Sequence, residues 1–260
     1  MPSGSHWKRS LSRWLSGNPA WIDQLDPKIL PVFVHLPKAG GTSINDFLKR
    51  VYGRGFLNVS NHAREWKQRR TSPDGVRCLA GHFKFGYHRA LGRCGEKDWP
   101  KDGLFTGRDI RYVTVVREPV ARVKSFYRYV KAAPKHRLHK ATIGMTPREF
   151  FDYLESIGVV EPWNQQSRRM GGKPEDRFFL CAPLDELDRF VEVLGAALGW
   201  PSELQVPHSN KTRKPRREDD GFDPELVSMI EERSAEDSEL FLEVSERFKA
   251  GDFPAFRISS

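Results

Sequence analysis

The chain has few cysteines and no long apolar run, and each shortage excludes a class of protein. Its 260 residues include three cysteines, Cys78, Cys94 and Cys181, which are widely separated and form no C-x-x-C pair. An odd number of scattered cysteines argues against a disulfide framework and indicates free thiols in a reducing compartment. The sequence also lacks the apolar core of a signal peptide and any apolar run near about 20 residues, so we expect no transmembrane segment.

Acidic residues are outnumbered by basic ones. The chain has 34 Asp and Glu against 43 Lys and Arg, for a net charge of +9. A surface of this sign attracts anionic partners, and on charge alone an anionic glycan and a nucleic acid fit equally well. Most single clusters of this kind are solvated faces. The main clusters are Arg69-Arg70, 131–140, Arg168-Arg169 and 213–217.

A glycine turn after a short apolar strand predicts an anion site. The strand comprises residues 32–36, and a helix is expected from Thr42 to Gly53. A helix N-terminus offers unpaired N–H groups and a positive dipole end, and Lys38 adds a cation. The Lys stands before the glycines, unlike the nucleotide loop G-x-x-x-x-G-K-[ST], and no G-x-G-x-x-G is present. The turn consists of Pro37, Lys38, Ala39, Gly40, Gly41, Thr42 and Ser43.

A second phosphate-binding pattern follows a β-branched strand at 112–116. Arg117-Glu118-Pro119 comes next, and apolar residues at helical spacing predict a helix that begins at Pro119. An arginine fork suits a phosphate group, and a small hydroxyl such as that of Ser125 can donate to it without bulk.

Together the two segments resemble the motifs of sulfotransferases that use 3′-phosphoadenosine 5′-phosphosulfate. The first matches P-K-x-x-x-T-S, and V-R-E-P-V-A-R-V-K-S-F-Y matches R-[DE]-P-x-x-R-x-x-S-x-Y. The resemblance implies that the loop 37–43 holds the 5′-phosphosulfate and that Lys38 contacts the leaving oxygen. It also implies that Arg117 and Ser125 bind the 3′-phosphate without any metal. A loop at 208–212 resembles H-x-[NR]-K-[ST], which makes Lys211 and Thr212 candidates for closing over the same nucleotide.

A histidine after the strand at 76–80 is the candidate base. The segment Gly81-His82-Phe83-Lys84-Phe85 resembles the G-H-x-x-[FY] motif of the heparan sulfate 2-O-sulfotransferase branch. In that branch the His removes a proton from the acceptor hydroxyl, a role that suits the near-neutral pKa of imidazole. Those enzymes have a second His two residues earlier, where this chain has Ala80. The base is therefore His82 alone, or a carboxylate such as Glu65.

The polar segment 163–172 is the candidate acceptor site. It resembles the family stretch N-x-Q-[ST]-R-x-[LM] and implies that Trp163, Asn164, Arg168 and Arg169 contact the acceptor sugar. An aromatic ring and paired arginine forks suit an anionic sugar. The alternative is a helix-to-loop turn with solvated arginines.

Alternating strands and helices predict one α/β domain over 31–250. We expect a mainly parallel sheet with helices on both faces, similar to P-loop NTPases, and ligands at the carboxyl ends of the strands. Residues 52–74 are predicted as loop or irregular helix, 146–149 as a capping box, 223–248 as one last helix and 251–260 as a tail. Residues 1–30 form a basic amphipathic extension, which either packs on the domain or frays, or contacts a membrane surface through residues 7–15.

The resulting hypothesis is a bacterial, cytoplasmic sulfotransferase that modifies a carbohydrate hydroxyl. The donor is 3′-phosphoadenosine 5′-phosphosulfate, no metal is needed, and no nucleic acid partner is expected. The identity of the acceptor and the oligomeric state stay open. The alternatives are a nucleotide-dependent kinase with a P-loop-like fold and a non-catalytic protein that binds polyanions or nucleic acid.

Overall fold

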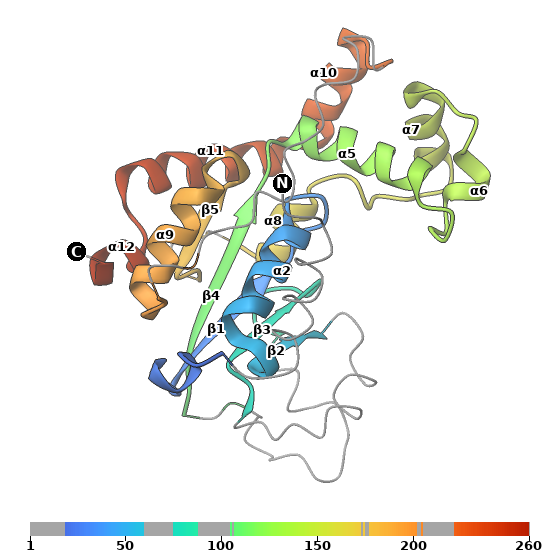
Figure 1. Ribbon diagram of the computed structural model, residues 1–260. Helices are drawn as coiled ribbons and strands as arrows, with labels where there is room; N and C mark the ends of the chain where they lie inside the picture. The colour runs from blue at the N-terminus through green and yellow to red at the C-terminus, as the bar shows by residue number, and fades with distance from the viewer. Residues whose placement is uncertain are drawn as a thin grey trace, which may run out of the picture.

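One parallel sheet forms the centre of the protein. The computed structural model describes residues 19–59, 75–87, 105, 107–172, 174, 177–201, 204 and 221–259. Within them, five parallel strands pair in the order β2-β3-β1-β4-β5 (Figure 1). The strands are β1 (Ile29–Val34), β2 (Phe56–Asn58), β3 (Cys78–Gly81), β4 (Asp109–Val116) and β5 (Leu180–Pro183). The predicted parallel α/β fold is thereby confirmed.

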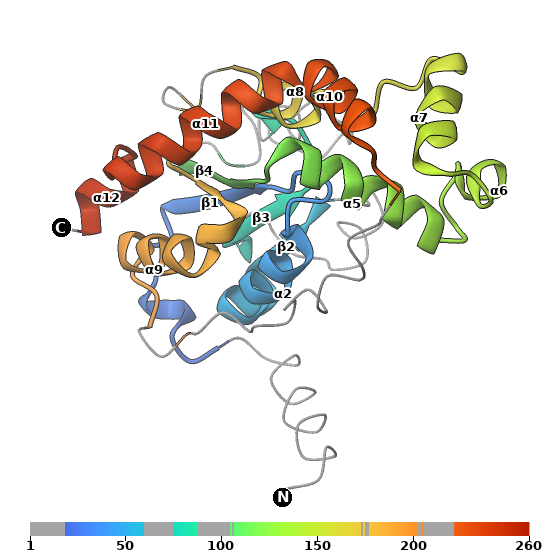
Figure 2. The same ribbon diagram turned by 90° about the horizontal axis from the view of Figure 1, so that it is seen from above.

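Helices cover both faces of the sheet, which explains why its central strand is apolar throughout. Figure 2 shows α2 (Gly41–Tyr52) and α9 (Leu187–Leu198) on one face and α11 (Ala235–Ala250) on the other. Successive residues of a strand point to opposite faces, yet Val32, Phe33 and Val34 are all buried. A parallel sheet that is covered on both sides needs such strands.

The strand order reverses beside β1, and this reversal positions the predicted site. From β1 the chain crosses to β2 at one edge and returns through β3, whereas β4 and β5 lie on the other side of β1. Ligands of open parallel sheets bind at the carboxyl ends of the strands where the order reverses. The anion loop follows β1, His82 follows β3 and Arg117 follows β4. All three motifs therefore lie along the side of the sheet that is formed by the carboxyl ends of its strands.

A group of helices beyond these carboxyl ends has a hydrophobic core of its own. It consists of α5 (Pro119–Ala132), α6 (His139–Thr142), α7 (Pro147–Ser156) and α10 (Pro224–Arg233), which we call the helical cap (Figure 1). Phe126, Phe150 and Ile230 are buried in this second core. The predicted capping box begins α7, where Glu149 Oε2 accepts from Thr146 N at 2.8 Å.

Two predictions of secondary structure were wrong in part. The segment 52–74 contains η2 (Gly53–Gly55) and the strand β2, while residues 60–74 lie outside the described part. Strand β2 has only three residues, which is too few for an alternation of apolar and polar side chains to show in the sequence. It is defined by its pairing with β3, which the sequence does not reveal. The expected single helix at 223–248 is two helices, α10 and α11, which separate at Ser234. The backbone of Ser234 leaves the helical conformation, with φ −112° and ψ 22°, and Ile230 packs in the cap core whereas Val244 packs in the main core.

The described chain ends are packed against the domain. Residues 251–260, expected as a tail, include α12 (Pro254–Ser259), which lies beside α9, and Phe253 and Ala255 are fully buried. At the other end, η1 (Ile22–Gln24) precedes β1, and the expected membrane contact at 7–15 lies outside the described residues. Among the helices that are described, none has the length and apolar character needed to cross a membrane.

Candidate active site

The loop between β1 and α2 leads into a helix N-terminus that no side chain caps. Gly40 and Lys38 have left-handed φ values of 76° and 68°. A Cβ atom on Gly40 would lie 2.4 Å from Leu184 Cδ1, and one on Gly41 would lie 1.9 Å from His35 Cδ2. The path of the loop therefore requires both glycines. The first N–H groups of α2 therefore have no side-chain cap, and a helix N-terminus of this kind suits an anion.

The other loop residues differ in how accessible they are. Thr42 is exposed and Pro37 is half-buried, whereas Ala39 and Ser43 are buried. Ser43 N donates to Gly40 O at 3.1 Å, which closes the first turn of the helix. Of the two predicted hydroxyl ligands, Thr42 is the one whose side chain is open to solvent.

Arg117 connects the second motif to this loop. Its Nη1 donates to the carbonyl oxygen of Lys38 at 3.1 Å, although the two residues are 79 positions apart. The side chain of the fully buried Gln166 bonds both the N–H and the carbonyl group of Arg117. Arg117 N donates to Gln166 Oε1 at 2.8 Å, and Gln166 Nε2 donates to Arg117 O at 2.9 Å. Gln166 belongs to α8 (Gln165–Met170), so α8 fixes the end of β4.

One face of helix α5 lies beside the loop 37–43 and its lysine. Lys38 Nζ lies 4.1 Å from the centre of the Tyr129 ring. Ser125 lies one helical turn before Tyr129, so both are on the α5 face that is turned toward the loop. Within the described residues, the Ser125 side chain makes no hydrogen bond. Tyr129 and Arg128 were missed in the sequence, although their spacing of four and three residues from Ser125 is a signal that could have found them.

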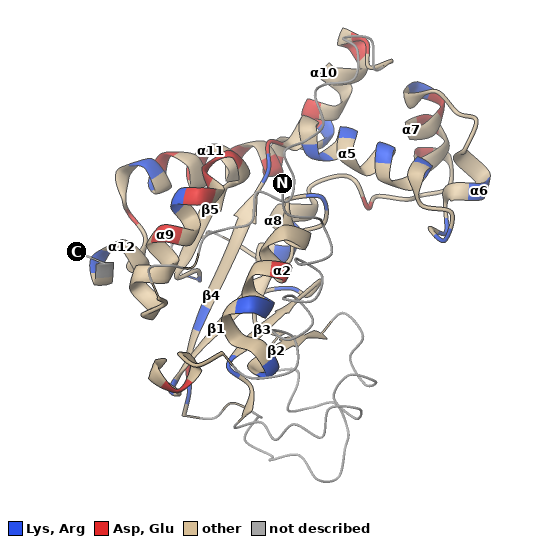
Figure 3. Ribbon diagram, in the orientation of Figure 1, with Lys and Arg blue, Asp and Glu red and all other residues tan. Residues whose placement is uncertain are grey.

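Positive charges at the loop repel one another. Burial, followed by the charge of Arg117, lowers the pKa of Lys38, and burial, followed by the charge of Arg128, lowers the pKa of Arg117. The neighbouring carboxylate of Glu118 caps α5 and accepts from Val120 N at 2.7 Å. Figure 3 shows the basic residues along α5 near this edge. A ligand with several negative charges relieves this repulsion.

His82 lies where β3 ends, with its side chain exposed on one side. Its Nδ1 is 2.9 Å from the carbonyl oxygen of His35, and since a carbonyl only accepts, Nδ1 is the donor. The neutral ring therefore has its lone pair on Nε2. Burial is the largest cause that lowers the pKa of His82 below 6.5; Arg169 lowers it too, and the hydrogen bond to His35 opposes them. His82 is thus neutral and able to accept a proton at pH 7.

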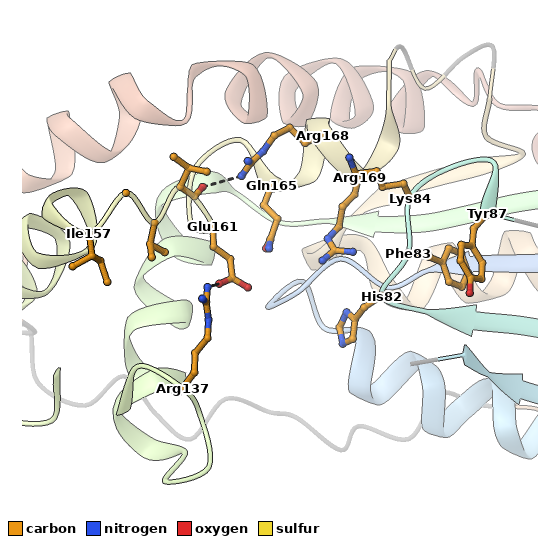
Figure 4. Close-up of a pocket in the computed structure, with 13 residues that line it drawn as sticks. His82, Phe83, Lys84, Tyr87, Arg137, Ile157, Glu161, Gln165, Arg168 and Arg169 are labelled. Atoms are coloured by element: carbon orange, nitrogen blue, oxygen red, sulfur yellow. Dashed lines mark hydrogen bonds and ion pairs between the residues drawn. The ribbon is translucent and has the colours of Figure 1, made fainter. Parts of the chain in front are cut away.

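A cleft of about 1020 Å³ begins at His82 and runs between the sheet edge, α8 and the helical cap (Figure 4). The guanidinium of Arg169 points toward His82. Arg137 in the cap forms an ion pair with Glu161 at 2.7 Å. Among the described residues, the side chains of Lys84 and Arg169 form no hydrogen bond or ion pair that would neutralise them. These two cations are available to a ligand.

The predicted acceptor segment divides into structural and cleft residues. Trp163 is half-buried and packs against the cap core with its ring 5.4 Å from that of Phe151, and Asn164 Oδ1 accepts from Asp237 N at 3.2 Å. Arg168 lines the cleft but donates to Val160 O at 2.9 Å and to Asn164 O at 3.0 Å. Arg169 is therefore the predicted acceptor residue that the structure places beside His82.

A buried ion pair stabilises this arrangement. Arg122 Nε and Asp237 Oδ2 are 3.6 Å apart, and both side chains are fully buried. Asp237 also accepts from Ser167 N at 2.8 Å and from Gln166 N at 3.3 Å, at the start of α8. Asp237 therefore links α11 to the helix that holds Arg117 in place.

We expect the Asp237→Ala change to lower the free energy of unfolding by about 3–5 kcal/mol, because it leaves Arg122 buried without a counter-charge. Urea unfolding measures this change. The control is Glu155→Gln, which removes the partly exposed pair with Arg233 and should cost less than about 1 kcal/mol. Equal unfolding midpoints for the two variants would contradict the structural role of Asp237.

The remaining predicted residues, Glu65, Lys211 and Thr212, lie outside the described residues. Within the part of the chain that is described, no group of three or more His, Cys, Asp or Glu side chains could hold a metal ion. A scan against protein-family models finds no match, and a search of curated proteins finds no similar sequence.

Proposed function

We propose that the protein is a sulfotransferase that moves a sulfuryl group from 3′-phosphoadenosine 5′-phosphosulfate to a hydroxyl of a carbohydrate. The observation that carries the proposal is the hydrogen bond from Arg117 to the carbonyl of Lys38. This bond joins a helix N-terminus and its lysine to a second cation, Arg117, and Ser125 lies on the neighbouring helix α5. A nucleotide with phosphate groups at both its 5′ and 3′ positions fits two neighbouring anion sites of this kind.

The residues have complementary roles in an in-line displacement. The acceptor oxygen forms a bond to sulfur while the bond from sulfur to the phosphate oxygen breaks, and His82 Nε2 takes the hydroxyl proton. Lys38 and the N–H groups at the start of α2 stabilise the charge that develops on the phosphate oxygen. Arg117 and Ser125 hold the remote 3′-phosphate, so their binding energy positions the donor. The products are a sulfate ester and adenosine 3′,5′-bisphosphate.

The cleft supports a carbohydrate acceptor. Its volume of about 1020 Å³ accommodates sugar units, and Arg169 and Lys84 near His82 favour one that carries negative charge. Cys78 and Cys181 are buried free thiols, which agrees with the reducing cytoplasm as the location.

Calorimetry with adenosine 3′,5′-bisphosphate and AMP tests the donor site. We expect the bisphosphate to bind more tightly than AMP. Ser125→Ala should weaken bisphosphate binding by about 3- to 10-fold, the value of one hydrogen bond, with AMP unaffected. Arg148→Ala, on the exposed surface of the cap, is the matched control. Equal affinities for the two nucleotides would overturn the donor assignment.

Turnover with labelled donor and a panel of glycosides and polysaccharides tests the reaction itself. Transfer that persists in EDTA separates the proposal from a kinase, which needs Mg²⁺ for phosphoryl transfer. A protein that only binds polyanions would show steep salt dependence and no preference for the bisphosphate.

A further inference from the structure

His35 lies between the two halves of the site. It directly follows β1 and is 9 % exposed, and its backbone N–H extends the sheet pairing to Gly81 O at 2.9 Å. In the sequence it looks like one polar residue at the end of an apolar strand. Its ring and its carbonyl group both contact residues of the candidate site.

On one side, His35 contacts the proposed base. The rings of His35 and His82 are stacked with centres 4.0 Å apart and planes inclined by 30°. The carbonyl of His35 is also the acceptor that fixes the Nδ1 proton of His82. One residue therefore determines both the orientation of the imidazole and which nitrogen carries the lone pair.

On the other side, His35 supports the anion loop. Its Cδ2 and Nε2 atoms occupy the space where a side chain on Gly41 would begin, at 1.9 and 2.1 Å from the Cβ position. Asn45, one turn into α2, contacts His35 Nδ1 at 3.2 Å through its Nδ2. The ring is thus packed under the first turn of the helix whose N-terminus faces the donor.

We infer that His35 is a positioning residue that holds the base His82 and the anion loop in a fixed relation to each other. The inference rests on the proposed function for its catalytic meaning, but the contacts themselves do not depend on it. Without the ring, His82 would gain solvent on the stacked face and Gly41 would lose its support. Misplacing reacting groups by about 1 Å costs about 100-fold in rate.

The charged groups around the pair fix the sign of the expected pH effect. Arg169 faces His82, and His82, Arg169 and Lys38 face His35. Burial is the largest cause that lowers both pKa values. Together with the charges of His82, Arg169 and Lys38 it lowers the pKa of His35 to about 3, so this ring stays neutral. Removing it exposes His82 to water and raises the pKa of His82 toward 6.5.

The test compares His35→Ala with His35→Phe, which keeps an aromatic ring in the stack. NMR titration of the His82 ring should show a raised pKa in the Ala variant and the original pKa in the Phe variant. With an accepted substrate, kcat of the Ala variant should fall by about 10- to 100-fold, with the acid limb of its pH profile moved upward. The Phe variant should recover most of this loss.

His139→Ala is the matched control, because His139 Nδ1 also bonds a backbone carbonyl, that of Val130 at 2.9 Å, but within the helical cap. It should leave the titration of His82 unchanged, and urea unfolding checks that all variants are folded. An unchanged His82 pKa in folded His35→Ala would overturn the inference. If the titration shifts but no acceptor is sulfated, the positioning contact stands and the proposed function fails.

Discussion

Replacing His82 by glutamine is expected to lower kcat/KM for sulfuryl transfer by about 10²- to 10⁴-fold, the usual contribution of a general base. Glutamine preserves much of the size and polarity of the side chain but cannot take the proton from the acceptor hydroxyl. Initial rates of adenosine 3′,5′-bisphosphate release, measured with and without acceptor, report the change. Affinity for the bisphosphate should stay close to its original value, since His82 lines the cleft in which we propose that the acceptor binds.

The pH profile provides a second measure of the same role. As the proposed base, His82 would act in its neutral form, so we expect activity to be lost as the pH falls through its pKa, which lies below 6.5. The acid limb of kcat/KM should therefore lie below pH 6.5 and disappear in the glutamine variant. His139→Gln serves as a control that keeps the limb. Full activity of the His82 variant would place the base elsewhere, with Glu65 as the next residue to replace.

Replacing Lys38 by alanine is expected to lower kcat by about 10²- to 10³-fold, as for the loss of one group that stabilises developing charge. In the proposed mechanism this effect belongs to the transition state, because negative charge would build on the phosphate oxygen only as its bond to sulfur breaks. Binding of the bisphosphate should weaken much less than kcat falls. Rapid-quench measurement of a single turnover separates this chemical step from product release.

Lys49→Ala is the matched control for Lys38. Lys49 is an exposed lysine in the last turn of α2, about two turns of helix away from the loop. Its removal should leave kcat and nucleotide affinity unchanged. If Lys38→Ala turns over at the original rate with an accepted substrate, Lys38 has no role at the leaving group.

Local sequence patterns were enough to predict the secondary-structure elements that surround the candidate site. The apolar strand before Pro37, the helix after Gly41 and the capping box at Thr146 were all identified from neighbouring residues. Their causes are local, because burial of a strand, a left-handed glycine and a cap depend on a few adjacent positions. The short strand β2 escaped because its only cause is pairing with a distant partner.

The roles of the polar residues in the predicted acceptor segment, by contrast, could not be predicted from local sequence patterns. Asn164 and Gln166 follow a pattern that suggests ligand contact, yet they satisfy buried backbone groups of Asp237 and Arg117. A side-chain amide binds a sugar and a backbone peptide with the same hydrogen-bonding groups. Which of the two it meets depends on the packing of α8 against β4 and α11.

The sequence by itself determined the parallel α/β fold and the glycine turn before α2, and it singled out Lys38, His82 and Arg117 as candidate residues. Only the tertiary structure decided that Arg117 bonds the Lys38 loop, that His35 contacts both His82 and the Gly41 turn, and that Trp163 packs against the cap core. The physical reason is that strand order and helix packing bring distant residues together. Neither leaves a periodic signal at the residues that it joins.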